Sequence, residues 1–207
     1  MTKRQSEFVT STDAAKLASL SVLSGLNAVA AGASAWIGSD GTWTSSFTNN
    51  AGEDIILVIW GPDGSWVNVG APLITYSLAS GAAVTVSFAE GLSGAWSAIY
   101  SDTETVNGQV SNTWGEFTFT PAGVVDVSRE VNMSGHGMVI NGPMCTTDMD
   151  TCVFVCSSGN TCMTDYLLQS CDNGSQEGAQ YGTYGGYPSG GCGWNMATSV
   201  ALDTQFY

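Results

Sequence analysis

All six cysteines lie in the last third of the chain, and this placement restricts the fold more than any other feature of the sequence. They are Cys145, Cys152, Cys156, Cys162, Cys171 and Cys192. The single histidine, His136, excludes a zinc site with paired histidines, and the spacings match neither a zinc ribbon nor a C-x-x-C redox motif. We therefore expect disulfides formed in an oxidising compartment, which indicates a secreted protein. The pairing stays open, because six cysteines can pair in many ways.

The charge of the chain excludes several classes of partner. The net charge is −14, and the basic residues are Lys3, Arg4, Lys16 and Arg129. Without a basic patch, nucleic acid and anionic lipid are poor partners, whereas neutral glycans, cations and basic proteins remain. No apolar run is long enough for a transmembrane segment. With 207 residues, 26 glycines and 11% charged residues, the sequence predicts one β-rich domain.

Residues 1–35 predict a processed leader and an N-terminal helix. Lys3-Arg4 before Gln5 resembles a dibasic processing site of the fungal secretory type. The rival interpretation is a signal peptide with its apolar region at 17–31 and a cleavage box at 33–35, but polar residues interrupt that region. Ser11-Thr12-Asp13 provides a helix start, and apolar residues at three- and four-residue spacing predict one helix over 12–32.

Residues 36–142 predict a β-sandwich. The continuous apolar run at 55–60 suits a strand that is buried on both faces. Further strands are predicted at 42–48, 74–78, 84–88, 96–101, 117–120, 124–131 and 138–140. Short strands separated by frequent turns indicate a sandwich or barrel. Residues 143–207 predict a disulfide-rich loop region, with a glycine-rich loop at 171–193 and a last strand at 199–206 that returns to the sandwich.

Three stretches of the predicted sandwich resemble the central signature of the thaumatin-like proteins. They are GEFTFT (115–120), VVDVS (124–128) and GHGMVI (135–140), and upstream FTNN (47–50), IWG (59–61), LASG (78–81) and GAW (94–96) occur in the family's order. The resemblance covers residues 43–140 and implies a thaumatin-like antiparallel β-sandwich with a shortened disulfide-rich region. The chain departs from the family in having fewer cysteines, and no arginine at 94–100, where the family's acidic cleft has one.

The resemblance implies an acidic cleft, and the residues support it independently. Glu116 and Asp126 match the cleft carboxylates of the family, and Glu130 lies about where the next one belongs. Side chains alternate along a strand, so Asp126, Ser128 and Glu130 share one face. Glu116 lies on a candidate neighbouring strand. If the two strands pair, the carboxylates converge and raise one another's pKa.

We expect a secreted protein that binds a cell-wall glycan of the β-glucan type, or a host extracellular target, and acts as a fungal effector or elicitor. The candidate ligand-binding residues are Glu116, Asp126, Ser128, Glu130, Tyr181 and Tyr184. One alternative is a weak β-1,3-glucanase that uses Glu116 and Asp126 as catalytic carboxyls. Another is a membrane-active sandwich of the actinoporin type, whose helix at 12–32 inserts into the target membrane. The plainest alternative is a solvated acidic face.

The remaining motifs carry weaker signals. Asn132 and Asn173 begin sequons for N-glycosylation. Asp148 and Asp150 fall short of a complete calcium loop, so a plain loop is expected there. His136 lies among glycines and is expected at a surface turn. The sequence predicts no metal and no cofactor, and it leaves the oligomeric state open.

Overall fold

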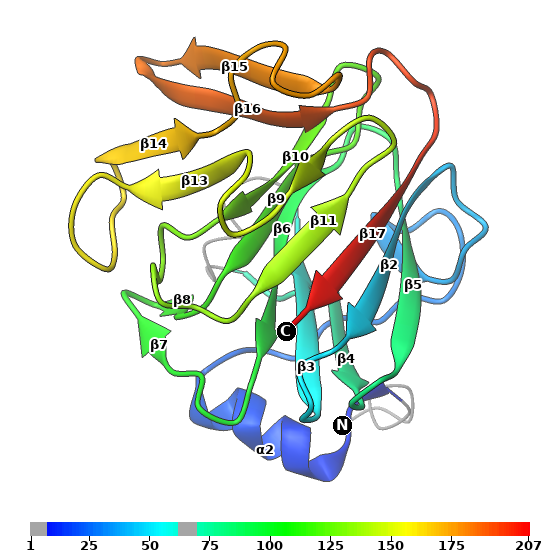
Figure 1. Cartoon of the computed structure of the whole chain (residues 1–207). Coiled ribbons are helices and arrows are strands. Elements are labelled where there is room, and N and C mark those ends of the chain that lie inside the picture. Colours follow the sequence, from blue (N-terminus) through cyan, green and yellow to red (C-terminus); the bar gives the residue numbers. More distant parts are fainter. Residues whose placement is uncertain (1–7, 62–69) are drawn as a thin grey trace.

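The computed structural model describes residues 8–61 and 70–207, so the Lys3-Arg4 pair lies outside the described residues. In this part of the chain, two large β-sheets pack face to face, with one short helix at one end of the sandwich (Figure 1). Three disulfides link cysteines within residues 145–192, in the last third of the chain. The prediction of an all-β sandwich with an N-terminal helix and a disulfide-rich region is confirmed.

The first sheet contains the returning C-terminal strand. Its order is β1 (Ala35–Ile37), β5 (Ala83–Phe88), β2 (Trp43–Asn49), β17 (Val200–Phe206), β11 (Met138–Asn141) and β12 (Thr146–Thr147). Strand β17 runs parallel to β2 and antiparallel to β11. The C-terminal strand therefore lies in one sheet with the first two strands of the chain, β1 and β2.

The second sheet carries the candidate site. Its main path is β14 (Tyr166–Gln169), β13 (Val153–Cys156), β10 (Val124–Ser128), β9 (Trp114–Thr118), β6 (Ser93–Ile99), β3 (Ile55–Trp60) and β4 (Ile74–Leu78). The hairpin β15 (Ala179–Tyr184) and β16 (Tyr187–Gly193) joins this path at β10, and β7 (Thr105–Val106) pairs with β8 (Gln109–Val110) apart from it. Because β2–β17 and β10–β13 are parallel pairs, the predicted antiparallel arrangement is corrected at these two places.

The core between the sheets is largely aromatic. Phe47 and Trp96 are fully buried and meet edge to face with their ring centroids 5.1 Å apart. All six residues of β3 are buried, as the apolar run predicts. Leu57 lies in the core between the sheets, whereas Ile56 lies in a second apolar cluster on the outer face of the second sheet. Strand β3 is thus covered on both sides.

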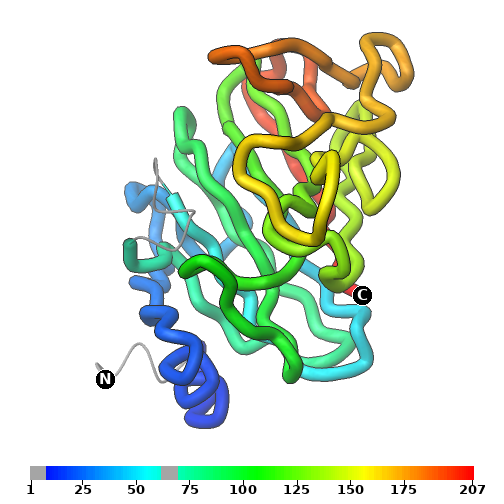
Figure 2. The backbone as a smooth tube through the Cα atoms, turned by 90° about the vertical axis from the view of Figure 1, so that its left-hand side faces the viewer, coloured from blue at the N-terminus to red at the C-terminus, as the bar shows by residue number. Residues whose placement is uncertain are grey.

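The N-terminal helix covers part of this outer face. In the second cluster Trp60 and Trp114 stack with their ring centroids 5.0 Å apart, and α2 (Ser11–Ser19) joins them through Leu17, which is 1% exposed. Helix α2 and the β15–β16 hairpin lie at opposite ends of the sandwich (Figures 1 and 2). The helix therefore does not cover the end of the sheet that faces the hairpin.

The helix is much shorter than the predicted 12–32, and that prediction is wrong. The helix begins as expected, since the Thr10 side chain accepts a hydrogen bond from the Asp13 N–H. Beyond residue 20 the chain instead binds β4: the Gly25 N–H donates to Thr75 Oγ1, and Asn27 Oδ1 accepts from the Thr75 N–H. Asn27 also takes a left-handed φ of 50°, which ends helical geometry. These pairings outweigh the apolar periodicity.

The long inserting helix that the membrane-active alternative requires is therefore not formed. Within the described ranges, the structure contains no helix with both the length and the apolar character needed to cross a bilayer. Leu17 and Val22, both within the predicted 12–32 helix, are buried in the cluster on the outer face of the sheet instead.

The prediction of a loop for the glycine-rich segment 171–193 is wrong, because this segment largely forms the β15–β16 hairpin. Gly185 and Gly186 form the turn of this hairpin, with φ of 60° and 91°. Gly190 and Gly191 instead permit close approach: a Cβ on Gly190 would lie 1.9 Å from the Gln180 carbonyl oxygen, and one on Gly191 would lie 2.7 Å from that of Val125. Both residues have φ near 137°, a region open mainly to glycine. A glycine-rich composition signals a loop to sequence analysis, and here it serves pairing.

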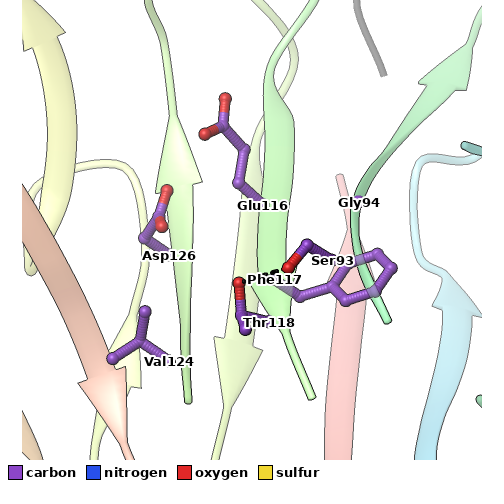
Figure 3. Close-up of a pocket in the computed structure, with 7 residues that line it drawn as sticks. All are labelled: Ser93, Gly94, Glu116, Phe117, Thr118, Val124 and Asp126. Carbon is purple, nitrogen blue, oxygen red and sulfur yellow. Dashed lines mark hydrogen bonds between the residues drawn. The ribbon is translucent and has the colours of Figure 1, made fainter. Parts of the chain in front are cut away.

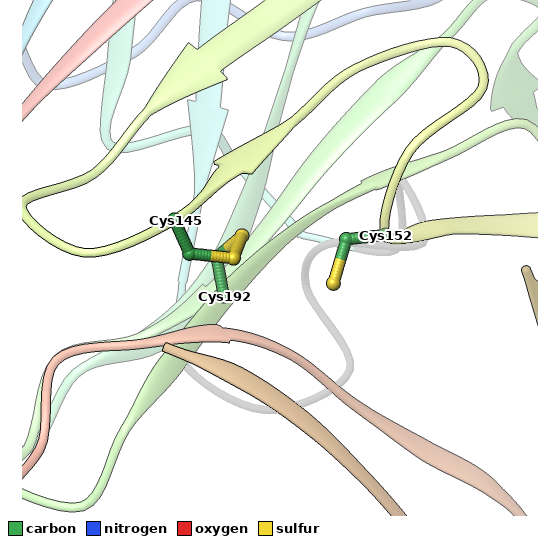
Figure 4. A group of neighbouring side chains, drawn as sticks. All are labelled: Cys145, Cys152 and Cys192. Carbon is green, nitrogen blue, oxygen red and sulfur yellow. A yellow bond between two sulfur atoms is a disulfide. The ribbon is translucent and has the colours of Figure 1, made fainter. Parts of the chain in front are cut away.

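The disulfides pair Cys145 with Cys192, Cys152 with Cys171 and Cys156 with Cys162, and none of the six cysteines is free. The sulfur atoms of Cys145, Cys152 and Cys192 lie within 4.8 Å of one another (Figure 4). Because each sulfur is already bonded in a disulfide, this cluster offers no thiolate to a metal. The predicted disulfides are confirmed, and they fit an extracellular protein.

We predict that Leu17→Ala lowers the free energy of unfolding by about 2–4 kcal/mol, because it removes a buried side chain that seals the outer cluster. Urea unfolding measures the change. Leu23→Ala is the matched control, since Leu23 is 61% exposed and should change the free energy by less than about 0.5 kcal/mol. Equal effects of the two variants would contradict the docked helix.

Candidate functional site

Strand β10 changes its partner along one edge, and this exchange shapes the site. Val124 and Val125 pair with β16, whereas Val127 and Ser128 pair with β13. Asp126 lies between the two pairings. The Val127 N–H donates to Thr147 Oγ1 at 2.8 Å. The hairpin and β13 therefore diverge at Asp126, and the space between them opens onto the outer face of the sheet.

A cavity of about 490 Å³ occupies this space, and we call it the acidic groove. Its lining combines carboxylic acids with aromatic rings: Glu116, Val124, Asp126, Glu130, Phe154, Met163, Tyr166, Tyr184, Tyr187, Pro188, Ser189 and Gly190. A smaller pocket of about 200 Å³ adjoins it and shares Glu116, Val124 and Asp126 (Figure 3). The structure thus brings together Glu116, Asp126 and Glu130, three residues that the sequence predicts as one site.

Glu116 and Asp126 are direct neighbours across two strands. The ladder between β9 and β10 places them opposite each other, so their side chains project from the same face (Figure 3). On the other side of Glu116, the residue opposite is Ala95 of β6. A methyl group therefore stands next to Glu116, in the stretch 94–100 where the family resemblance calls for an arginine.

Glu130 reaches the groove from beyond the strand. Strand β10 ends at Ser128, so the predicted single strand over 124–131 is too long. The Cys156–Cys162 disulfide closes a short loop over this segment, and the Cys162 N–H donates to the Glu130 carbonyl oxygen at 2.9 Å. The loop therefore fixes the backbone from which the Glu130 side chain extends.

Burial raises the pKa of all three carboxyl groups. Desolvation raises the pKa of Glu116 from 4.5 to about 7, and desolvation together with the charge of Glu116 raises that of Glu130 to about 8. Desolvation, then the charges of Glu116 and Glu130, raise the pKa of Asp126 well above its ordinary value. A hydrogen bond from Ser128 partly opposes the shifts of the two glutamates. The protein thus gathers carboxyls where ionisation is costly.

The described part of the chain brings no basic side chain into the groove to offset these charges. Its Lys and Arg residues are Lys16 and Arg129. The Lys16 ammonium donates to the carbonyls of Ser101 and Thr103, and the Arg129 guanidinium donates to those of Met133 and Met149. Both cations are bound elsewhere.

Aromatic rings form the opposite wall of the groove. Tyr166 and Tyr187 stack with their centroids 6.0 Å apart, and Tyr184, at the end of β15, is 85% exposed. Tyr181 does not line the groove. It is three positions from Tyr184 on the same strand and so faces the other side of the hairpin. The grouping of Tyr181 with Tyr184 as one stacking surface is therefore wrong.

Sequence analysis missed Tyr166, Phe154 and Met163 as groove residues. The available signal for Tyr166 was the short apolar stretch Tyr-Leu-Leu (166–168) between Cys162 and Cys171, which forms most of β14. Ser128 is buried and adjoins the acids, as its position on β10 predicts, without lining the cavity itself.

The two sequon asparagines have different surroundings. Asn132 is half-buried, with its Nδ2 donating to Ser111 and its Oδ1 accepting from the Ser134 N–H. Asn173 is exposed, and its Nδ2 donates to the Tyr181 carbonyl oxygen. Glycosylation of either residue stays a prediction, and its exposure favours Asn173.

His136 is not a plain surface residue. Its ring stacks on Tyr100 with centroids 3.7 Å apart, and its Nε2 lies 2.9 Å from Asp102 Oδ1. Asp148 behaves as the plain loop expected: its Oδ1 accepts from the N–H groups of Asp150 and Thr151. Both segments lie apart from the acidic groove.

The fold and the groove define a disulfide-stapled, all-β sandwich protein with a carboxyl-lined groove on one sheet. The chain belongs to the family of Allergen Asp f 4-like domains, whose model matches residues 34–183. No curated protein matches the chain. Among solved structures, the thaumatin-like xylanase inhibitor TLXI aligns over 78% of this chain and 97% of its own, at 10% identity and a TM-score of 0.40.

We predict that the raised pKa values make stability fall as the pH rises. Between the ordinary pKa of 4.5 and about 8, the folded protein holds protons that the unfolded chain has released. Each such proton lowers the free energy of unfolding by about 1.4 kcal/mol per pH unit. Glu130→Gln should therefore flatten the decline between about pH 5 and pH 8, measured by urea unfolding, because glutamine does not ionise.

Glu177→Gln is the control for this experiment, because Glu177 is exposed and lies outside the groove. It should leave the pH profile of the wild-type protein unchanged. Identical profiles for wild type and Glu130→Gln would show that Glu130 is not held in a costly environment.

Proposed function

We propose that this chain is a secreted protein that binds a cell-wall polysaccharide of the β-glucan type in the acidic groove. The observation that carries the proposal is the composition of the groove: tyrosine rings on one wall and carboxyl groups on the other, around about 490 Å³ of accessible space. Pockets of this kind, apolar surface with a few convergent polar groups, are the usual form of ligand sites.

Each wall of the groove can contact a different part of a sugar unit. The faces of Tyr166, Tyr184 and Tyr187 offer apolar area to the C–H faces of pyranose rings. The carboxyl groups opposite accept hydrogen bonds from hydroxyls, and when protonated they also donate one. Because burial raises the pKa of Glu116 to about 7, this group is protonated in mildly acidic surroundings. The groove can then hold a neutral glycan without an ion pair.

The expected role follows from this ligand. An extracellular protein of this type, if fungal, would act on the wall of its own cell or as an effector or elicitor toward a host. A host extracellular target in place of a glycan is the corresponding alternative, and the binding experiment below separates the two.

We predict that the wild-type protein is retained on insoluble β-1,3-glucan, and that Tyr184→Ala and Tyr187→Ala each weaken binding by about tenfold, since each removes a ring of the stacking wall. Depletion from solution across a glucan titration gives the affinities. Tyr181→Ala is the matched control, because this tyrosine lies outside the groove. If the wild type is retained no better than an unrelated acidic protein, the proposal fails.

A second candidate, a β-1,3-glucanase, is favoured by one specific observation. Glu116 and Asp126 are directly opposed on neighbouring strands, which places their Cβ atoms about 5 Å apart. Cβ atoms at this spacing allow the two carboxyls to approach the separation of about 5 Å that retaining glycosidases use, with one carboxyl of raised pKa as the general acid. Glu116, with its pKa raised to about 7, has the protonation state that this role needs.

If the groove is catalytic, we predict that the protein releases reducing ends from laminarin and that Glu116→Gln reduces the rate by at least about a hundredfold, because amide nitrogen cannot deliver the proton. A reducing-sugar assay measures the release, with Glu177→Gln as the control. Equal release by wild type and Glu116→Gln would leave binding as the sole function of the groove.

A further inference from the structure

We infer that the acidic end of the groove binds the ammonium group of an amino sugar, so that the preferred ligand is a polysaccharide rich in glucosamine and not a neutral glucan. The inference rests on the proposed function and specifies its substrate class. The acidic end is formed by Glu116, Asp126 and Glu130.

The first argument is an orphaned oxygen. Asp126 is only 5% exposed, and its Oδ1 has no hydrogen-bond partner although it is fully buried from solvent. The same side chain lines both the groove and the adjoining pocket. A buried acceptor without a donor is costly, and a ligand that supplies the donor removes that cost. Asp126 is therefore placed to receive an N–H or O–H group from a ligand.

The second argument is charge. Three carboxyls converge, and the residue next to Glu116 on β6 is Ala95, not a cation. The described basic residues, Lys16 and Arg129, bind backbone carbonyls elsewhere. A sugar hydroxyl could satisfy the orphaned oxygen, but it would not stabilise the ionised form of the buried carboxyls. An ammonium group supplies three donors and a positive charge at once.

The third argument separates an amino sugar from a bare metal ion. Among the described residues, the oxygens of Glu116, Asp126 and Glu130 do not gather within 4.8 Å of one another as a trio, so a single cation, metal or ammonium, would not contact all three at once. The discrimination therefore comes from the opposite wall of the groove. The tyrosine wall has no part in metal binding, whereas it lies where the sugar ring of a glucosamine unit would stack. The site thus combines a tyrosine surface for the sugar ring with carboxyl groups for the ammonium group on that ring.

The test compares oligosaccharides of equal length by calorimetry at about pH 6, where an amine is protonated. The probes are β-1,4-linked glucosamine, its N-acetylated form and β-1,3-linked glucose. We expect the glucosamine oligomer to bind about tenfold or more tightly than either neutral oligomer. Its binding should release protons from the carboxyls, detected as a dependence of the heat on the ionisation enthalpy of the buffer, and should weaken as salt is added.

Asp126→Asn and Glu116→Gln should each abolish the preference for the amino oligomer, and Glu177→Gln should retain it. Glu177→Gln changes the net charge equally without touching the groove, so it separates a specific site from general attraction by a chain of net charge −14. Urea unfolding of each variant checks the fold. If Asp126→Asn does not fold, Glu116→Gln, at a half-buried position, carries the test.

Each other outcome overturns a defined claim. Equal affinity for amino and neutral oligomers would refute the inference and leave the proposed function standing. A preference that survives both groove variants would also refute it. Tight binding of Ca²⁺ alone, lost in Asp126→Asn, would assign the acids to a metal instead. If no oligomer binds, the proposed function fails with the inference.

Discussion

The exchange of partners along β10 is the constraint on which the rest of the site depends. A strand offers one row of hydrogen-bonding groups to each side, so β16 and β13 cannot pair with the same residues. Strand β16 pairs with residues 124–125 and strand β13 with residues 127–128, and the two strands separate at Asp126. One consequence is a cavity at the point of separation. The other is that strand pairing before and after Asp126 fixes its backbone, so that its side chain stays directed into the cavity.

The acids in this cavity contradict the usual rule that buried charges are paired. The same chain satisfies most of its other buried polar groups through backbone pairing and side-chain bonds. Natural proteins tolerate such local costs mainly at functional sites. The family model matches residues 34–183, which include β9, β10, β13 and β14 and end before β16. The cost of gathering these acids is the reason for which we propose that the groove is a binding site and not a solvated face.

Much of the fold and the acidic residues of the groove could be predicted from the sequence, for identifiable reasons. The run at 55–60 was read correctly because burial on both faces leaves an unbroken apolar stretch. Glu116 and Asp126 were found because alternation fixes the face of a residue once its strand is known. The aromatic wall was only partly found, because Tyr166 lies on β14, a strand of four residues that is too short to show a periodicity. The helix was predicted too long because the partner of residues 25–27 is β4, some fifty residues away.

The loop closed by Cys156 and Cys162 has a consequence for when the groove exists. That loop holds the backbone of Glu130, and Met163 beside it forms part of the rim. The Cys145–Cys192 bond likewise ties the hairpin that carries Tyr187 to the strand β12 region. In a newly made chain with reduced thiols, neither wall is secured. The two walls of the groove are thus secured only after the thiols are oxidised, a step that requires an oxidising compartment.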